Sequence, residues 1–132
     1  MGRSEIRQHI FMMLFRIEFN REEEMPDQLR YYFAELNDIK EADRVYIEKK
    51  YELIAGRRSE IDQIIDAHIT GWKTSRMNKV DLTILRLAVY EIKWDEDIPT
   101  KVAINEAVEL AKKFSGDEGP SFINGVLAKL AG

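Results

Sequence analysis

The chain has 132 residues, a formal net charge of −4 and no cysteine. Its length predicts a single domain, residues 1–132, that buries a core without cross-links. The absence of cysteine excludes disulfides and cysteine-ligated metals, and it is compatible with a reducing compartment. No apolar run approaches the roughly 20 residues that span a bilayer. Charged residues interrupt the N-terminal apolar stretch that a signal peptide would need, so we expect a cytoplasmic protein.

Apolar side chains recur at helical spacing through the first half of the chain and predict four helices. The first helix carries one aliphatic stripe and a second stripe formed by Phe11, Phe15 and Phe19, which indicates burial on both sides. An alternative for the second stripe is a self-association surface. The expected bounds of these helices are about Ser4–Phe19, a start at Pro26, about Glu41–Ala55 ending before Gly56, and a start at Ser59.

The fourth of these helices carries a capping signal and a histidine. Ser59 is followed by Asp62 three residues later, and we expect Ser59 to be the N-cap. His68 falls on the apolar stripe of that helix, and a partly buried structural histidine is expected rather than a metal ligand. His9 lies far away in the sequence, and no metal-binding motif contains either histidine.

The second half predicts three further helices and no strand. The segment Lys79–Trp94 is apolar around most of its circumference and is therefore expected to be a central helix. The next helix begins near Thr100, a candidate N-cap after Pro99, and the last begins at Pro120. No segment alternates at a period of two over strand length. The fold class predicted is all-α, a bundle of about seven helices.

Residues suited to catalysis are sparse. The carboxylates cluster in three predicted loops, at Glu22–Glu24, Asp95–Asp97 and Asp117–Glu118. Solvated turn residues explain the first two clusters, and the third lies at a helix start, where acids are favoured by the helix dipole. No nucleophile elbow and no glycine-rich phosphate loop occurs. The sequence therefore predicts that the chain is not an enzyme and needs no cofactor or metal.

Basic residues and one phenylalanine point instead to RNA. Arg3 and Arg7 are four residues apart and are expected on one helical face. A run without acids, comprising Lys73, Arg76 and Lys79, precedes the central helix. Phe122 follows Ser121 at a helix start and lies beside the main apolar stripe. It is suited either to stacking on an RNA base or to fastening the helix start to the bundle. A solvated face is the alternative for each basic group.

Three segments of the C-terminal half resemble the NusB family of transcription antitermination factors. They are VDLTILRLAVYEI (Val80–Ile92), IPTKVAINEAVELAKKF (Ile98–Phe114) and SFINGVLAKL (Ser121–Leu130). The resemblance covers essentially the whole chain and is tightest from about residue 72 onward. It implies an all-helical fold of two packed three-helix sub-bundles.

The resemblance also implies partners. The ligand would be the single-stranded boxA element of nascent ribosomal-RNA transcripts, and the protein partner would be the ribosomal small-subunit protein NusE. The two proteins together would act on an RNA polymerase antitermination complex and promote read-through of terminators. No reaction, cofactor, membrane or small-molecule substrate is implied.

Family positions can be carried over one at a time. The RNA contacts of the family fall on Arg3, Arg7 and Gln8 near the N-terminus and on Ser121 and Phe122 at the last helix, and the basic run adds Arg76 and Lys79. The contacts to NusE fall on Asp81, Asp117 and Glu118. Asn105, Glu106, Asn124 and Gly125 also match the family, and we interpret Asn105, Asn124 and Gly125 as packing or structural positions.

The chain departs from the family at its N-terminus. Some family members carry a dense arginine run there, whereas Ser4, Glu5 and Ile6 separate Arg3 from Arg7. Each lost phosphate contact weakens binding and flattens its salt dependence. We therefore expect weak RNA binding by the chain alone and a marked gain when NusE is present.

Three alternatives remain. A NusB-like accessory domain is fused to some RNA cytosine methyltransferases, but no methyl-donor domain follows in this chain, which favours a free-standing factor. A protein-binding helical adaptor fits the acidic net charge. An all-α enzyme is disfavoured because no acid–base constellation is found.

Overall fold

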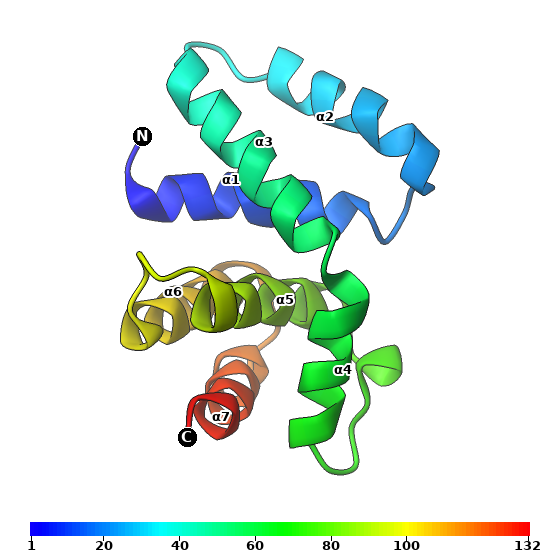
Figure 1. Ribbon diagram of the computed structural model, residues 1–132, viewed down its shortest axis with the longest axis vertical. Coiled ribbons are helices and arrows are strands. Elements are labelled where there is room, and N and C mark those ends of the chain that lie inside the picture. Colours follow the sequence, from blue (N-terminus) through cyan, green and yellow to red (C-terminus); the bar gives the residue numbers. More distant parts are fainter. The chain divides into compact units, whose positions relative to one another are not determined.

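Seven α-helices and two short 3-10 helices make up the computed structural model, which describes residues 1–132 (Figure 1). In chain order they are α1 Arg3–Arg16, η1 Glu22–Glu24, α2 Met25–Ala34, α3 Glu41–Ala55, α4 Arg58–His68, η2 Thr74–Arg76, α5 Lys79–Trp94, α6 Thr100–Phe114 and α7 Gly119–Ala131. The all-α prediction is confirmed, and the expected bounds of α3 and α5 agree with the structure. None of the helices is long and apolar enough to cross a membrane.

The chain divides into two compact units, Met1–Gly56 and Arg57–Gly132. The first unit holds α1, α2 and α3, as the family resemblance implies. The second holds four α-helices, α4 to α7, rather than three.

In the first unit, α1 contacts both α3 and α2. The aliphatic stripe of α1 is buried at Ile10, Met13 and Leu14, and the facing side of α3 buries Ile47, Tyr51 and Ile54. The second stripe of α1 divides along its length: Phe11 is buried, whereas Phe19 is 65% exposed. The difference arises because α1 ends at Arg16, and tighter i to i+3 hydrogen bonds then carry the chain away from the helix.

A polar and aromatic contact ties α2 to α1. Nδ1 of His9 shares a hydrogen bond with the hydroxyl of Tyr32, and the Arg16 guanidinium lies 4.8 Å from the centre of the Tyr32 ring. Burial lowers the pKa of His9, partly offset by the nearby carboxylate of Glu5. Burial also raises the pKa of Tyr32. Both shifts favour neutral partners at this contact.

We predict that acid destabilises the protein partly through His9. Its pKa is lower in the folded state, so the unfolded chain binds the proton more readily. The contribution of neutral His9 is complete above its unfolded pKa of about 6.5 and is lost as the pH falls below that value. Urea unfolding at about pH 7.5 and about pH 5.5 should show a smaller loss of stability in His9→Gln than in the wild type. His68→Gln, at an exposed histidine, is the control. Equal losses in the wild type and His9→Gln would contradict the prediction.

In the second unit, α5 is the central helix, as its sequence predicts. It contacts α4, α6 and α7, and Figure 1 shows it among these helices. Nearly all of its middle is buried: Leu82, Thr83, Ile84, Leu85, Leu87, Ala88, Val89, Tyr90 and Glu91. The apolar circumference is needed because three helices pack on different sides of α5.

Two polar contacts hold α4 and the following loop. The Arg86 guanidinium donates to both carboxylate oxygens of Asp62, at 2.9 and 2.8 Å, and joins α5 to α4. Asp66 accepts from the backbone N–H and the hydroxyl of Thr74, at 2.8 and 3.0 Å. The second contact fixes the loop that leads from α4 to α5.

Replacing Arg86 by Met should cost about 2–3 kcal/mol, because it leaves the mostly buried Asp62 carboxylate without its ion-pair partner. The side chains of this pair are only 11% and 24% exposed. The matched control is Arg30→Ala, which removes an ion pair with Asp27 whose side chains are 66% and 57% exposed. Its effect should stay within about 0.5 kcal/mol. Chemical denaturation of both variants measures the difference, and a loss for Arg86→Met no larger than that of the control would refute the assigned role.

Three cap predictions are corrected by the structure. Helix α4 begins one residue before Ser59, and its N-cap is Arg57, with no side-chain capping bond. Asp62 is drawn instead to Arg86, so it does not complete a capping box. Thr100 is the first residue of α6, and Pro99 occupies the N-cap.

The prediction for His68 is also wrong, because its side chain is exposed. It is the last residue of α4, and its ring Nδ1 pairs with the carbonyl oxygen of Ile64 one turn earlier. A position on the apolar stripe does not bury a side chain where the helix ends.

Candidate functional site

A side-chain hydrogen bond joins the start of α5 to the end of α6. The Ser115 hydroxyl, at the C-cap of α6, donates to Oδ1 of Asp81 at 2.6 Å. The backbone N–H of Asp81 in turn donates to Oδ1 of Asn78, the N-cap of α5, at 2.9 Å. Asp81 is therefore held in place from two sides, through its side chain and through its backbone.

The turn between α6 and α7 packs tightly against the hydrogen bond between Ser115 and Asp81. The N–H of Gly119 donates to the carbonyl of Gly116 at 2.9 Å, and the N–H of Phe122 donates to that of Glu118 at 3.0 Å. Gly119 is buried, and a Cβ at this position would lie 2.0 Å from Oγ and 2.5 Å from Cβ of Ser115. Only glycine allows α7 to begin this close to Ser115.

Gly119→Ala should destabilise the protein by about 1–3 kcal/mol, because the added methyl must push Ser115 away from Asp81. Gly125→Ala is the matched control, since Gly125 is exposed in the same helix and nothing outside that helix's own backbone lies within 4 Å of the place that its added methyl would take. The packing role expected for Gly125 from the sequence is therefore wrong. That control should be neutral or more stable by about 0.5–1 kcal/mol. Thermal and urea unfolding compare the two, and similar effects in both would show that the contact at Ser115 is unimportant.

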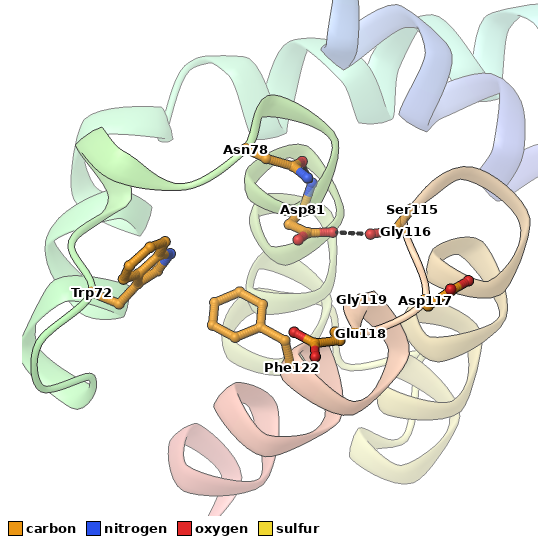
Figure 2. A pocket seen from close by; sticks show the side chains of 9 residues that line it. All are labelled: Trp72, Asn78, Asp81, Ser115, Gly116, Asp117, Glu118, Gly119 and Phe122. Atoms are coloured by element: carbon orange, nitrogen blue, oxygen red, sulfur yellow. Dashed lines mark hydrogen bonds between the residues drawn. The ribbon is translucent and has the colours of Figure 1, made fainter.

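A hollow of about 670 Å³ lies beside this turn (Figure 2). Its wall contains two aromatic rings and three carboxylates and has no cationic side chain. The lining residues are Trp72, Asn78, Asp81, Ser115, Gly116, Asp117, Glu118, Gly119 and Phe122. In Figure 2, Phe122 rises from the first turn of α7 on the side toward Trp72, which comes from the loop after α4. Phe122 is partly buried, and Trp72 is 49% exposed.

The family of the chain follows from comparison with known proteins. The model of the NusB family matches residues 4–132. The chain belongs to the NusB family. The transcription antitermination protein NusB of Agathobacter rectalis is 54% identical, over 99% of this chain and 100% of its own length. That of Lachnoclostridium phytofermentans is 48% identical, over 98% of both chains. Proteins of this family are antitermination factors rather than enzymes.

Solved NusB structures have the same fold. NusB of T. maritima superposes with a TM-score of 0.87 at 30% identity and covers 99% of this chain and 91% of its own. A crystal structure of the antitermination factors NusB and NusE in complex with double-stranded RNA matches with a TM-score of 0.84 at 26% identity. It covers 98% of this chain and 95% of that one.

Four residues predicted from the NusB resemblance share the hollow. Phe122, predicted for RNA, lies with Asp81, Asp117 and Glu118, which were predicted for NusE. Around it, Ser121 is exposed next to Phe122 at the start of α7. On the second unit, the predicted RNA residue Phe122 is therefore adjacent to the three acids predicted for NusE rather than on a separate face.

Two of the residues predicted for RNA, Arg76 and Lys79, are close in the sequence to a residue that lines the hollow. Arg76 ends η2, and Lys79 is the first residue of α5; both are exposed. Asn78, between them, lines the hollow.

The N-terminal NusB positions lie on the other unit. Arg3 is exposed, Gln8 is partly buried, and Arg7 is only 6% exposed. The expectation that Arg3 and Arg7 present their charges from one open face is corrected by this burial. Four-residue spacing places two side chains on one side of a helix, but it does not show which part of that side is covered.

Sequence reasoning missed part of the hollow. Trp72, Asn78, Ser115 and Gly119 were not predicted as site residues, although Asn78 carried a usable signal, since an asparagine directly before an apolar run is a favoured N-cap. Ser115 and Gly119 had no such signal, because their contact depends on how α6 and α7 meet. No group of three or more acidic or histidine side chains is placed to hold a metal ion.

Proposed function

We propose that the chain binds the boxA RNA of nascent ribosomal-RNA transcripts together with the ribosomal protein NusE and promotes read-through by RNA polymerase. Membership of the NusB family supports the antitermination role. The crystal structure of a related NusB with NusE and RNA supports the two kinds of partner. The observation in this chain that carries the proposal is the hollow, where an aromatic ring and a cluster of carboxylates lie together.

We propose that the RNA binds along the basic and aromatic residues of the second unit. The exposed cations Arg76 and Lys79 contact phosphates, and Phe122 offers a partly exposed ring to a base. Ser121 adds a hydroxyl beside that ring. Arg3, Arg7 and Gln8 are proposed as further RNA contacts, on the first unit. Because Arg7 is buried, it contacts RNA directly only if its surroundings change on binding. Without such a change, its role is to position the neighbouring RNA-binding residues.

NusE is proposed to contact Asp81, Asp117 and Glu118. The last two are exposed in the turn before α7, where a basic partner can reach them. One oxygen of Asp81 accepts the Ser115 hydroxyl, so Asp81 also sets the position of the turn that carries the other two acids. Residues 1–132 are proposed to work as one domain, in the cytoplasm, within an RNA polymerase antitermination complex.

The first test is a fluorescence-anisotropy titration of boxA RNA and a scrambled RNA, with and without NusE, at two salt concentrations. We expect weak binding by the chain alone and tighter, salt-sensitive binding of boxA when NusE adds its own basic surface. Equal affinities with and without NusE would refute the cooperation. No preference for boxA over the scramble would leave a protein-binding adaptor as the function.

Variants then separate phosphate contacts from base contacts. Lys79→Ala should lower the slope of log affinity against log salt by about 0.7, the value for one phosphate contact on a single strand. Phe122→Ala should weaken binding by about 1–3 kcal/mol with little change of slope. Lys49→Ala, at an exposed lysine of α3, is the control and should leave both quantities unchanged. A salt slope unaltered by Lys79→Ala would remove that residue from the interface.

A further inference from the structure

We propose that Trp72 is the second aromatic wall of the hollow and that one unpaired RNA base binds against Trp72 and Phe122. The inference rests on the proposed function, since it takes RNA binding as given. It gives a role to Trp72, a residue to which the family resemblance assigned no function.

Trp72 is unusually exposed compared with the other tryptophan of the second unit. The other tryptophan, Trp94, packs on Tyr90 with ring centres 5.8 Å apart and has the Arg57 guanidinium 4.4 Å from its own ring centre. Trp72 is 49% exposed at the edge of a hollow instead. A large aromatic side chain left in water at a concave site is typical of a binding surface.

The loop that carries Trp72 is anchored. Two residues further on, the backbone and hydroxyl of buried Thr74 are both bonded to Asp66 of α4. On the other side, Gly71 adopts φ +81, a left-handed conformation that glycine accepts at no steric cost. The ring is thus presented by a fixed turn, and less conformational entropy is lost when a base stacks on it.

The charges around the hollow decide which part of a nucleotide enters it. The lining includes the carboxylates of Asp81, Asp117 and Glu118 and no cation, so a phosphate would be repelled from the interior. Cations lie next to the lining residues in the chain instead: Lys73 follows Trp72, and Lys79 follows Asn78. This arrangement suits a neutral base inside the hollow, between the rings of Trp72 and Phe122. The phosphate backbone would then pass along Lys73 and Lys79.

An unpaired base is the occupant that fits. In a double helix the faces of a base are covered by its neighbours and its pairing edge is occupied, so it has no face to offer to two rings. Single-stranded RNA can turn one base out of its stack and into the hollow. An aromatic side chain of a protein partner is the competing occupant, and measurements with and without RNA distinguish the two.

The spectroscopic test uses Trp94→Phe, which leaves Trp72 as the only tryptophan of the chain. Single-stranded boxA RNA is added to this variant in complex with NusE, and tryptophan emission and RNA anisotropy are followed in the same titration. We expect the Trp72 emission to be quenched with the same midpoint as the rise in anisotropy, because stacking brings the base against the indole. The emission of NusE with RNA alone is subtracted.

The binding test compares Trp72→Ala with Trp72→Phe. The alanine variant should bind boxA about 5- to 100-fold more weakly with an unchanged salt slope, and the phenylalanine variant should retain most of the affinity. Tyr31→Ala, which removes a 55% exposed aromatic side chain on α2, is the control and should bind like the wild type. Circular dichroism and thermal unfolding of each variant establish that it is folded.

Each result decides between the proposals. Normal boxA affinity of Trp72→Ala together with unchanged emission overturns the role of Trp72 and leaves the proposed function standing. Weaker binding of Trp72→Ala to NusE in the absence of RNA would assign the hollow to the protein partner and also overturn it. If the wild-type chain with NusE shows no RNA binding at all, the proposed function and this inference both fail.

Discussion

The hydrogen bond between Ser115 and Asp81 organises the second unit around its hollow. It joins the end of α6 to the first turn of α5, and the start of α7 packs directly against it through Gly119. The turn carries Asp117 and Glu118, and the first turn of α7 carries Phe122, so this contact acts together with the packing of α5, α6 and α7 to set their positions. A short, partly buried hydrogen bond to a carboxylate is among the stronger polar contacts available to a protein.

The distribution of charge along the chain explains how an acidic protein can be suited to RNA. The net charge is −4, and repulsion from a polyanion would be expected if the charge were spread evenly. Three carboxylates line the hollow, whereas Lys73, Arg76 and Lys79 form an acid-free run before α5. Charge separated in this way lets one region approach a basic protein while the neighbouring region approaches phosphates.

Much of the fold could be predicted from the sequence, because the spacing of apolar residues along a helix indicates which of its sides are buried. The apolar circumference of Lys79–Trp94 predicted a central helix, and three other helices pack on it. Phe122 was singled out by its place at a helix start beside the apolar stripe, and the acids of the hollow were assigned to a partner through the family resemblance. Trp72 was missed because a single aromatic residue in a polar loop has no periodic pattern.

The residues of this chain by themselves determined its helices, its family and the types of side chain available for binding. Those properties depend on local spacing and on motifs, which can be read along one segment at a time. Only the tertiary structure decided that Arg7 is buried, that His68 is exposed and that Asp62 pairs with Arg86 rather than capping α4. Each of these depends on what a second segment places beside the residue. The hollow itself is such a case, because Trp72 and Phe122 are far apart in the sequence and come to line one hollow only through the packing of α4, α5 and α7.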